Sequence, residues 1–122
     1  MIDDQDEGNP LPALQDALRK FAAARDWDQF HSPKNLAAAL SVEAAELLEH
    51  FQWLDEEESR NLISDRLQKV EEEMADVLLY LLRLADKLSV DLVEAAKRKI
   101  EINKNKYPVD KARGSHKKYT DL

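Results

Sequence analysis

The feature that most constrains the fold is a broad apolar stripe at helical spacing between residues 67 and 88. At about 100° per residue one sector collects Leu67, Val70, Met74, Val77, Leu78, Leu81, Leu82, Leu84 and Leu88. Such a stripe predicts a long helix that packs against other helices. Only two glycines and four prolines occur in 122 residues, so few helix breakers are present and the rest should be helical too.

Three further amphipathic segments are predicted as helices, over residues 12–25, 34–54 and 92–106. The helix with the broad stripe is expected over 59–88, with a possible break near residues 64–65, after an acidic solvated loop over 55–59. Ser32 before Pro33, and Asp91, are typical of helix starts. Four helices with short connections indicate an all-α, up-and-down four-helix bundle.

The stripe on residues 67–88 is wider than one small bundle would cover, and Leu79 widens it further. We therefore expect the chain to form homo-oligomers through its helices. Two-fold dimers are the commonest arrangement, and either dimers or tetramers are compatible with this pattern.

Length and composition predict one domain over residues 11–108, with a flexible acidic tail over 1–10 and a basic tail over 109–122. The absence of cysteine suits a reducing cytoplasm, and the acidic start lacks the basic residues of a signal peptide. No apolar run approaches the ~18 residues of a membrane span, so we expect a cytoplasmic location. A net charge of −7 argues against binding to nucleic-acid polymers but leaves free nucleotides possible.

Two acidic pairs border the apolar stripes of two predicted helices. Glu43 and Glu46 are three residues apart, as are Glu73 and Asp76, so each pair puts two carboxylates on one helix face. If the helices lie side by side, four carboxylates converge and need a compensating cation. Oxygen ligands of this kind favour Mg²⁺. The alternative is that both pairs are ordinary solvated surface residues.

Aromatic rings gather in the connection before residue 33, where Trp27, Phe30 and His31 lie within five residues. These rings either fold over the end of the bundle as an apolar lid or stack against a nucleobase.

The last predicted helix carries Asn103 on its inner side, with Lys106 nearby. An inward amide either bridges helices through hydrogen bonds or contacts a substrate, with Lys106 near a phosphate. In the basic tail, Lys111 and Arg113 are either solvated or folded back over a bound polyanion.

The order Glu43-x-x-Glu46 and then Glu73-x-x-Asp76 resembles the signature of the all-α nucleoside triphosphate pyrophosphohydrolases of the MazG kind. More narrowly, four segments are similar to the dCTP pyrophosphatase branch of that family, over residues 25–36, 46–53, 76–80 and 102–108. The resemblance spans nearly all of residues 12–108. Val42 stands where the opening motif usually has a glutamate, a difference common in this branch.

The resemblance implies Mg²⁺-dependent hydrolysis of a nucleoside triphosphate, with dCTP or a related pyrimidine deoxynucleotide expected first, to the monophosphate and pyrophosphate. Glu43, Glu46, Glu73 and Asp76 would be the metal ligands and catalytic acids. The substrate would contact Trp27, Phe30, His31, Trp53, Tyr80, Asn103, Lys106, Lys111 and Arg113. It also implies dimers or dimers of dimers, with active sites bordered by neighbouring subunits.

A competing hypothesis is a non-catalytic helical module that senses nucleotides or binds a protein partner through the apolar stripe. A di-iron carboxylate bundle fits poorly, because that pattern uses Glu-x-x-His and Glu46 is four residues from His50.

Overall fold

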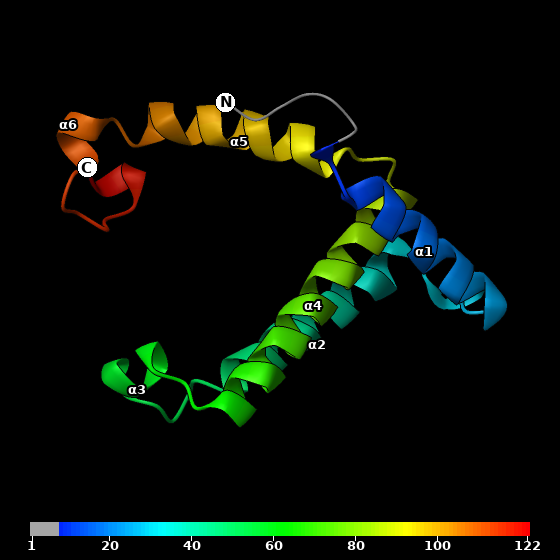
Figure 1. Ribbon diagram of the computed structural model, residues 1–122. Coiled ribbons are helices and arrows are strands. Elements are labelled where there is room, and N and C mark those ends of the chain that lie inside the picture. Colours follow the sequence, from blue (N-terminus) through cyan, green and yellow to red (C-terminus); the bar gives the residue numbers. More distant parts are fainter. Residues whose placement is uncertain (1–7) are drawn as a thin grey trace. The chain divides into compact units, whose positions relative to one another are not determined.

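The computed structural model describes residues 8–122, which form helices and turns without a β-strand in that range (Figure 1). The all-helical prediction is confirmed. The described residues divide into two compact units, the first ending at Ser89 and the second beginning at Val90. Most of the predicted acidic tail over 1–10 lies outside the described residues. Among residues 8–122, no helix is both long and apolar enough to cross a membrane.

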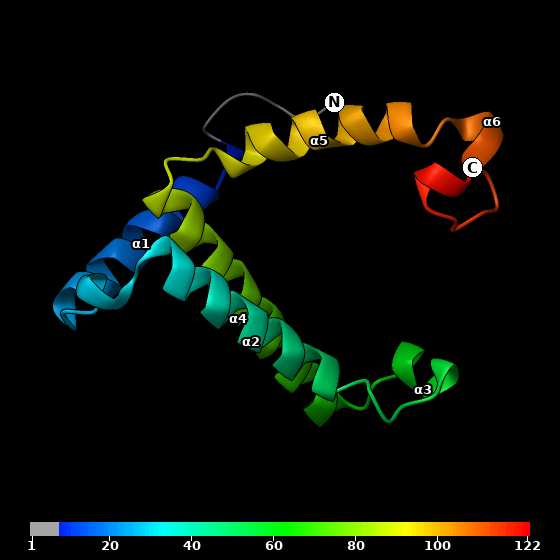
Figure 2. The same cartoon turned by 180° about the vertical axis from the view of Figure 1, so that it is seen from behind.

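The first unit is built on three long helices, α1 (Leu11–Ala24), α2 (Pro33–Glu49) and α4 (Ser64–Lys87). Two shorter elements join them, the 3-10 turn η2 (Asp28–Phe30) and helix α3 (Glu56–Arg60). Helices α2 and α4 lie side by side and antiparallel in both views, and α1 packs against α4 (Figures 1 and 2). The buried apolar residues are Ala22, Leu36, Val70, Leu82 and Ala85. Helix α4 is therefore central to this unit.

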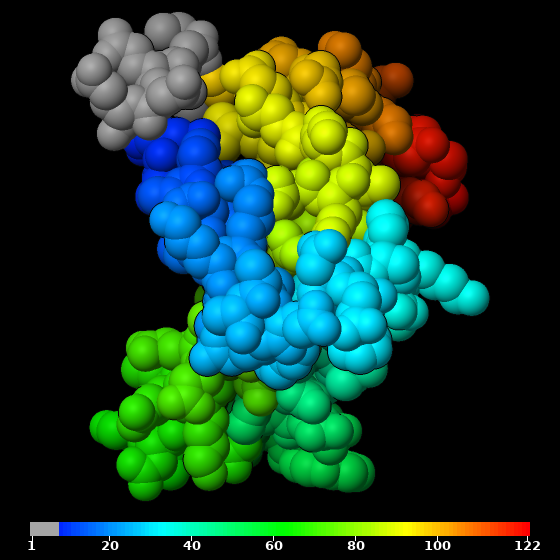
Figure 3. Space-filling view, turned by 90° about the vertical axis from the view of Figure 1, so that its right-hand side faces the viewer, coloured from blue at the N-terminus to red at the C-terminus, as the bar shows by residue number. Residues whose placement is uncertain are grey.

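The two halves of α4 are covered to different extents. Figure 3 shows α1 (blue) beside the yellow-green C-terminal part of α4, whereas the green segments of the chain extend beyond α1. Gln15 of α1 fixes this packing, because its Nε2 donates to the Leu82 carbonyl at 3.1 Å. In the other half of α4, Leu67 is 45% exposed and Met74 is 56% exposed. Apolar surface therefore remains uncovered along α4.

Both helix starts expected from capping residues are confirmed. Ser32 is the N-cap of α2, its Oγ accepts from the Asn35 amide at 3.1 Å, and Pro33 is the first helical residue. Asp91 caps α5 (Leu92–Lys106) in the same way, and its Oδ1 accepts from the Glu94 amide at 3.1 Å. In each case a side-chain oxygen satisfies an amide that has no partner within the helix.

The acidic loop predicted over 55–59 is wrong, because this segment starts a helix of its own. Asp55 Oδ1 accepts from the Glu58 amide at 2.7 Å, and Glu58 Oε1 accepts from the Asp55 amide at 3.0 Å. This reciprocal capping box stabilises the first turn of α3. The chain then leaves the helix near Asn61, and α4 begins at Ser64. The expected break near 64–65 thus lies just before α4.

Helix α2 ends five residues earlier than predicted, at Glu49 instead of Leu54. The carbonyl of His50 accepts from Nη1 of Arg66, on α4, at 2.9 Å. The Leu54 amide, which a continued helix would direct at that carbonyl, donates to Phe51 at 2.9 Å instead. A contact between distant residues therefore ends this helix.

The second unit contains α5, the short helix α6 (Val109–Ala112) and the turn η3 (Tyr119–Asp121). The predicted end of α5 before Tyr107 and Pro108 is confirmed. Tyr119 meets Tyr107 edge to face, with ring centroids 6.0 Å apart, and Lys106 Nζ lies 4.7 Å from the Tyr119 centroid. The basic tail therefore folds back on the end of α5.

Candidate functional site

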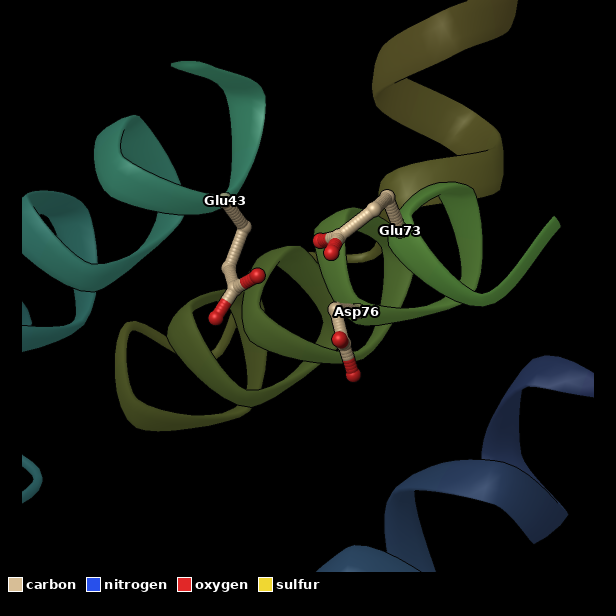
Figure 4. A group of neighbouring side chains, drawn as sticks. All are labelled: Glu43, Glu73 and Asp76. Atoms are coloured by element: carbon tan, nitrogen blue, oxygen red, sulfur yellow. The ribbon is translucent and has the colours of Figure 1, made fainter. Parts of the chain in front are cut away.

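Three of the four predicted acids converge where α2 faces α4. Figure 4 shows the Glu43 carboxylate from α2 turned toward those of Glu73 and Asp76 from α4. One carboxylate oxygen from each residue lies within 4.8 Å of the other two. The spacing of three residues puts Glu73 and Asp76 on adjacent turns of one face, and the packing of α2 on α4 adds Glu43.

The fourth predicted acid, Glu46, lies outside this group of three. It is half-buried one turn after Glu43 on α2, and its carboxyl group interacts with that of Glu43. Glu46 thus borders the group from the α2 side.

The convergence is electrostatically unfavourable without a cation. Oε2 of Glu43 and Oε2 of Glu73 are both buried and have no hydrogen-bond partner within residues 8–122. Burial, together with interactions with the carboxyl groups of Glu46, Glu73 and Asp76, raises the pKa of Glu43 to about 7. A buried acceptor without a donor costs roughly 1–3 kcal/mol.

These residues fit a divalent metal ion. A hard cation such as Mg²⁺ takes carboxylate oxygens as ligands, and the group presents three of them from two helices. Bound there, the ion would supply the counter-charge that the two partnerless oxygens lack.

The aromatic connection after α1 forms a small ring cluster. Trp27 meets Phe21 edge to face with centroids 5.6 Å apart, and it meets His31 at 6.5 Å. Phe30 is 60% exposed and Trp27 is 44% exposed. Trp27 thus packs against Phe21 and His31, while Trp27 and Phe30 keep exposed ring surface.

The end of α1 sets the place of Trp27. The Trp27 amide donates to the Ala22 carbonyl at 2.9 Å and the Asp26 amide donates to Ala23 at 3.2 Å, which together make a Schellman motif. Asp26 has the left-handed φ of 55° that this motif requires. The turn therefore folds Trp27 back onto Phe21.

His31 is held by a residue that the sequence reasoning missed. Arg83 Nε donates to His31 Nδ1 at 3.1 Å, and Arg83 Nη2 donates to Asp28 Oδ1 at 2.6 Å. Lys87 also pairs with Asp28. Burial, followed by the positive charges of Arg83 and Lys87, lowers the pKa of His31.

The ion pairs continue to α1. Asp86 accepts from Arg19 Nε at 2.7 Å and from Arg19 Nη2 at 2.8 Å, and it lies 3.4 Å from Arg83 Nη1. Hydrogen bonding to Arg19 lowers the pKa of Asp86, and hydrogen bonding to Lys87 lowers that of Asp28. The sequence contained one indication that Arg83 belongs near the site. Arg83 follows Tyr80 by three residues and therefore shares its helix face.

The other predicted substrate residues are spread over the chain. Tyr80 is half-buried on α4, and Trp53 is 85% exposed beyond the end of α2. Helix α2 has 17 residues, a length of ~25 Å. Because Trp27 precedes that helix and Trp53 follows it, one chain does not bring these two rings together.

Four predicted substrate residues, Asn103, Lys106, Lys111 and Arg113, belong to the second unit. Asn103 was expected on the inner side of its helix, but it is exposed, and α5 has no buried residue that would define an interior. Lys106 is half-buried against Tyr119, whereas Lys111 and Arg113 are exposed.

The chain resembles known proteins over most of its length. The dCTP pyrophosphatase 1 of Bos taurus is 47% identical over 116 residues, which cover 91% of this chain and 69% of that protein. The human dCTP pyrophosphatase 1 is 46% identical over 119 residues, covering 93% of this chain and 70% of that protein.

A solved structure has the same fold. The crystal structure of a pyrophosphatase from Archaeoglobus fulgidus superposes with a TM-score of 0.78 at 45% identity, covering 88% of this chain and 99% of that one. The model of the MazG-like family matches residues 38–122, which include all four predicted acids. The chain therefore belongs to the MazG-like family.

Proposed function

We propose that this protein is a Mg²⁺-dependent nucleoside triphosphate pyrophosphohydrolase that converts dCTP, or a related pyrimidine deoxynucleotide, to the monophosphate and pyrophosphate. The observation that carries the proposal is the convergence of Glu43, Glu73 and Asp76, with two buried oxygens that have no partner within the described residues. The names of the relatives, which are dCTP pyrophosphatases in cattle and human, supply the substrate.

The metal ligands in this proposal are Glu43, Glu46, Glu73 and Asp76. When bound, the ion supplies positive charge for the phosphate oxygens and lowers the pKa of a coordinated water. We assign to Glu46, which borders the group of three, the role of accepting a proton from the attacking water. The carboxylates of Glu43, Glu73 and Asp76 need no movement of α2 or α4 to meet, because their oxygens already lie within 4.8 Å of one another.

The nucleoside end of the substrate is assigned to the aromatic residues. Rings of Trp27, Phe30, His31 and Tyr80 would hold the base and sugar, because stacking on a flat ring suits any nucleobase. Trp53 would reach the same nucleotide from a neighbouring subunit, since it lies at the far end of α2 from Trp27. The remaining assigned contacts are Asn103 to the sugar, and Lys106, Lys111 and Arg113 to the phosphates.

We also propose the assembly that such a site needs. In this proposal residues 11–108 are the catalytic domain, with the four-helix bundle as its expected architecture. The chains then pair into dimers or tetramers through apolar surface left open on α4. That surface is formed by Leu67, Met74, Leu78 and Leu81, each at least 37% exposed.

A nucleotide screen tests the proposal. The four ribonucleoside and four deoxyribonucleoside triphosphates are incubated with the protein, with and without Mg²⁺, and pyrophosphate and monophosphate are measured. We expect equal amounts of both products, fastest from dCTP, and none without the metal. Binding of nucleotide without pyrophosphate release would favour the non-catalytic sensing module, and early release of orthophosphate would contradict the proposed cleavage site.

Matched variants separate the acid cluster from other surface acids. Glu43→Gln and Asp76→Asn should lower kcat by at least about 100-fold, because each removes a charge that holds the metal. Glu49→Gln is the control, because Glu49 is an exposed acid on α2 outside the group of three. Equal losses of kcat in all three variants would show that the activity does not depend on this site.

A further inference from the structure

Arg83 is a buried charge that the proposed reaction does not use. Its residue is 6% exposed, and it is the one buried polar or charged residue within the described part of the chain. A buried guanidinium is retained at low cost only when acceptors satisfy its donors. Those acceptors are His31 and Asp28 in the connection between α1 and α2, together with Asp86 on α4.

We propose that Arg83 is a positioning residue, which fixes the segment 26–31 in the shape that receives the nucleoside part of the substrate. The inference rests on the proposed function for the identity of the substrate. Arg83 itself would not touch the nucleotide, because its side chain is 7% exposed and lies behind Asp28 and His31.

The bond from Arg83 determines which nitrogen of His31 carries the proton. An arginine Nε can only donate, so His31 Nδ1 must accept, and the proton of the neutral ring is then on Nε2. His31 therefore offers a hydrogen-bond donor at Nε2. The same bond fixes the plane of the imidazole, which the Trp27 ring meets at 65°. Arg83 thus orients the His31 ring, which borders Trp27.

The register of α4 connects this segment to the acid cluster. Glu73, Asp76, Tyr80, Arg83 and Lys87 fall within about 80° of one another around the helix axis. Asp76 and Arg83 are seven residues apart, a distance of ~10 Å along the axis. Phosphates held through a metal ion at the carboxylates would leave the nucleoside to extend along this face, past Tyr80, toward the segment that Arg83 holds.

Kinetics separate positioning from general stability. In Arg83→Leu we expect KM for dCTP to rise on the order of tenfold, with kcat within about twofold, because the nucleoside contacts are displaced and the carboxylates are not. Arg83→Lys keeps the charge beside Asp28 and should recover part of the affinity. Arg19→Leu is the matched control, because Arg19 pairs with Asp86 at the outer end of the network and touches neither Asp28 nor His31 in the structure. It should lower the melting temperature without changing KM.

A second variant tests the same contact from the other side. Asp28→Asn should raise KM about as much as Arg83→Leu, and the double variant should show little further increase, because both changes break one pair. Independent, multiplicative effects in the double variant would overturn the proposal, as would an equal KM increase in Arg19→Leu.

A nucleotide-free measurement keeps this inference distinct from the proposed function. Hydrogen exchange of the amides of residues 27–31 should be faster in Arg83→Leu than in the wild type or in Arg19→Leu, since the segment loses its anchor on α4. Unchanged exchange in Arg83→Leu would overturn the positioning role, whatever the activity. Wild-type protein that hydrolyses no nucleotide would overturn the proposed function instead, and the exchange experiment would still test the anchor.

Discussion

The carboxyl groups of Glu43 and Glu73 lower the free energy of unfolding of the metal-free protein. Each has a buried oxygen without a partner in the described range. Glu43→Gln should therefore stabilise the metal-free protein by about 1 kcal/mol, because a neutral amide repels neither Glu73 nor Asp76. Thermal unfolding in a chelating buffer measures the difference.

Addition of Mg²⁺ should make the wild type more stable than Glu43→Gln. The wild type should gain melting temperature with increasing Mg²⁺, because the ion binds only the folded chain, and Glu43→Gln should gain much less. Glu49→Gln should respond like the wild type. A wild-type protein that is indifferent to Mg²⁺ would count against a metal site here.

His31 gives a prediction about pH. Its pKa lies below the ordinary 6.5, because burial and the charges of Arg83 and Lys87 disfavour the imidazolium more than Asp28 favours it. Between 6.5 and this lower pKa, the unfolded chain binds a proton that the folded chain does not. The free energy of unfolding contributed by His31 is therefore full above pH 6.5 and falls as the pH drops through that window.

Proton NMR of the His31 ring checks this directly. The wild-type titration midpoint should lie below 6.5, and in Arg83→Leu it should move up toward 6.5. His116, in the basic tail, provides an internal comparison in the same spectra. A wild-type His31 midpoint at or above 6.5 would be incompatible with the contacts described.

The acids could be found from the sequence and Arg83 could not, for one physical reason. Residues three apart on a helix are neighbours whatever the fold, so the two acidic pairs follow from spacing alone. Arg83 is defined by Asp28 and His31, which lie more than 50 residues away in the sequence. Its spacing from Tyr80 gives a shared face but does not reveal what packs on that face.

Among the helices, the end of α4 is strained in a way that can be relieved. Ser89 follows the C-cap Leu88 with a left-handed φ of 55°, and its amide donates to the Asp86 carbonyl at 3.2 Å. Ser89→Gly should stabilise the protein by roughly 0.5–1 kcal/mol, since glycine adopts this conformation without a steric cost. Chemical denaturation measures the gain.

Ser89→Ala is the matched control for that change. Alanine removes the hydroxyl but keeps the Cβ, so it should bring no stabilisation. If Ala and Gly stabilise equally, the effect belongs to the lost hydroxyl and the backbone explanation is wrong.

Helix starts were easier to predict than helix ends. The caps at Ser32 and Asp91 are local, and both were read correctly. The capping box Asp55-x-x-Glu58 is equally local and was readable, but the run of acids around it resembled a solvated loop. The end of α2 depends on Arg66 of α4, and no pattern within residues 34–54 records that contact.

For the assembled protein, the open apolar surface of α4 predicts self-association. Leu67, Met74, Leu78 and Leu81 fall within about 60° around the helix, on a different side from Glu73 and Asp76. Leu78→Lys should shift the chain from oligomer to monomer, because a buried unpaired ammonium disfavours the interface. Sedimentation velocity measures the change.

Val109→Lys is the control for that experiment, because Val109 is 68% exposed on α6 and lies outside this surface. It should leave the sedimentation coefficient unchanged. A wild-type protein that is monomeric at all concentrations would contradict the proposed assembly, and with it the contribution of Trp53 from a neighbouring subunit.

The all-helical class followed from residue spacing, because the broad stripe and the scarcity of glycine and proline leave little else. How four helices combine does not follow in the same way. The broad apolar stripe of residues 67–88 predicts that other helices cover α4. The same stripe would suit α5, a second chain or both. The four-helix bundle and the number of subunits therefore stay predictions.

The partnerless oxygens of Glu43 and Glu73 have a practical consequence for anyone who engineers this protein. A library selected for heat resistance in EDTA would enrich neutral replacements at both positions. The selected variants would be heat-stable but catalytically inactive. Selection in a buffer that contains Mg²⁺ would instead keep the acids, because the bound ion would then make the active protein the more heat-stable one.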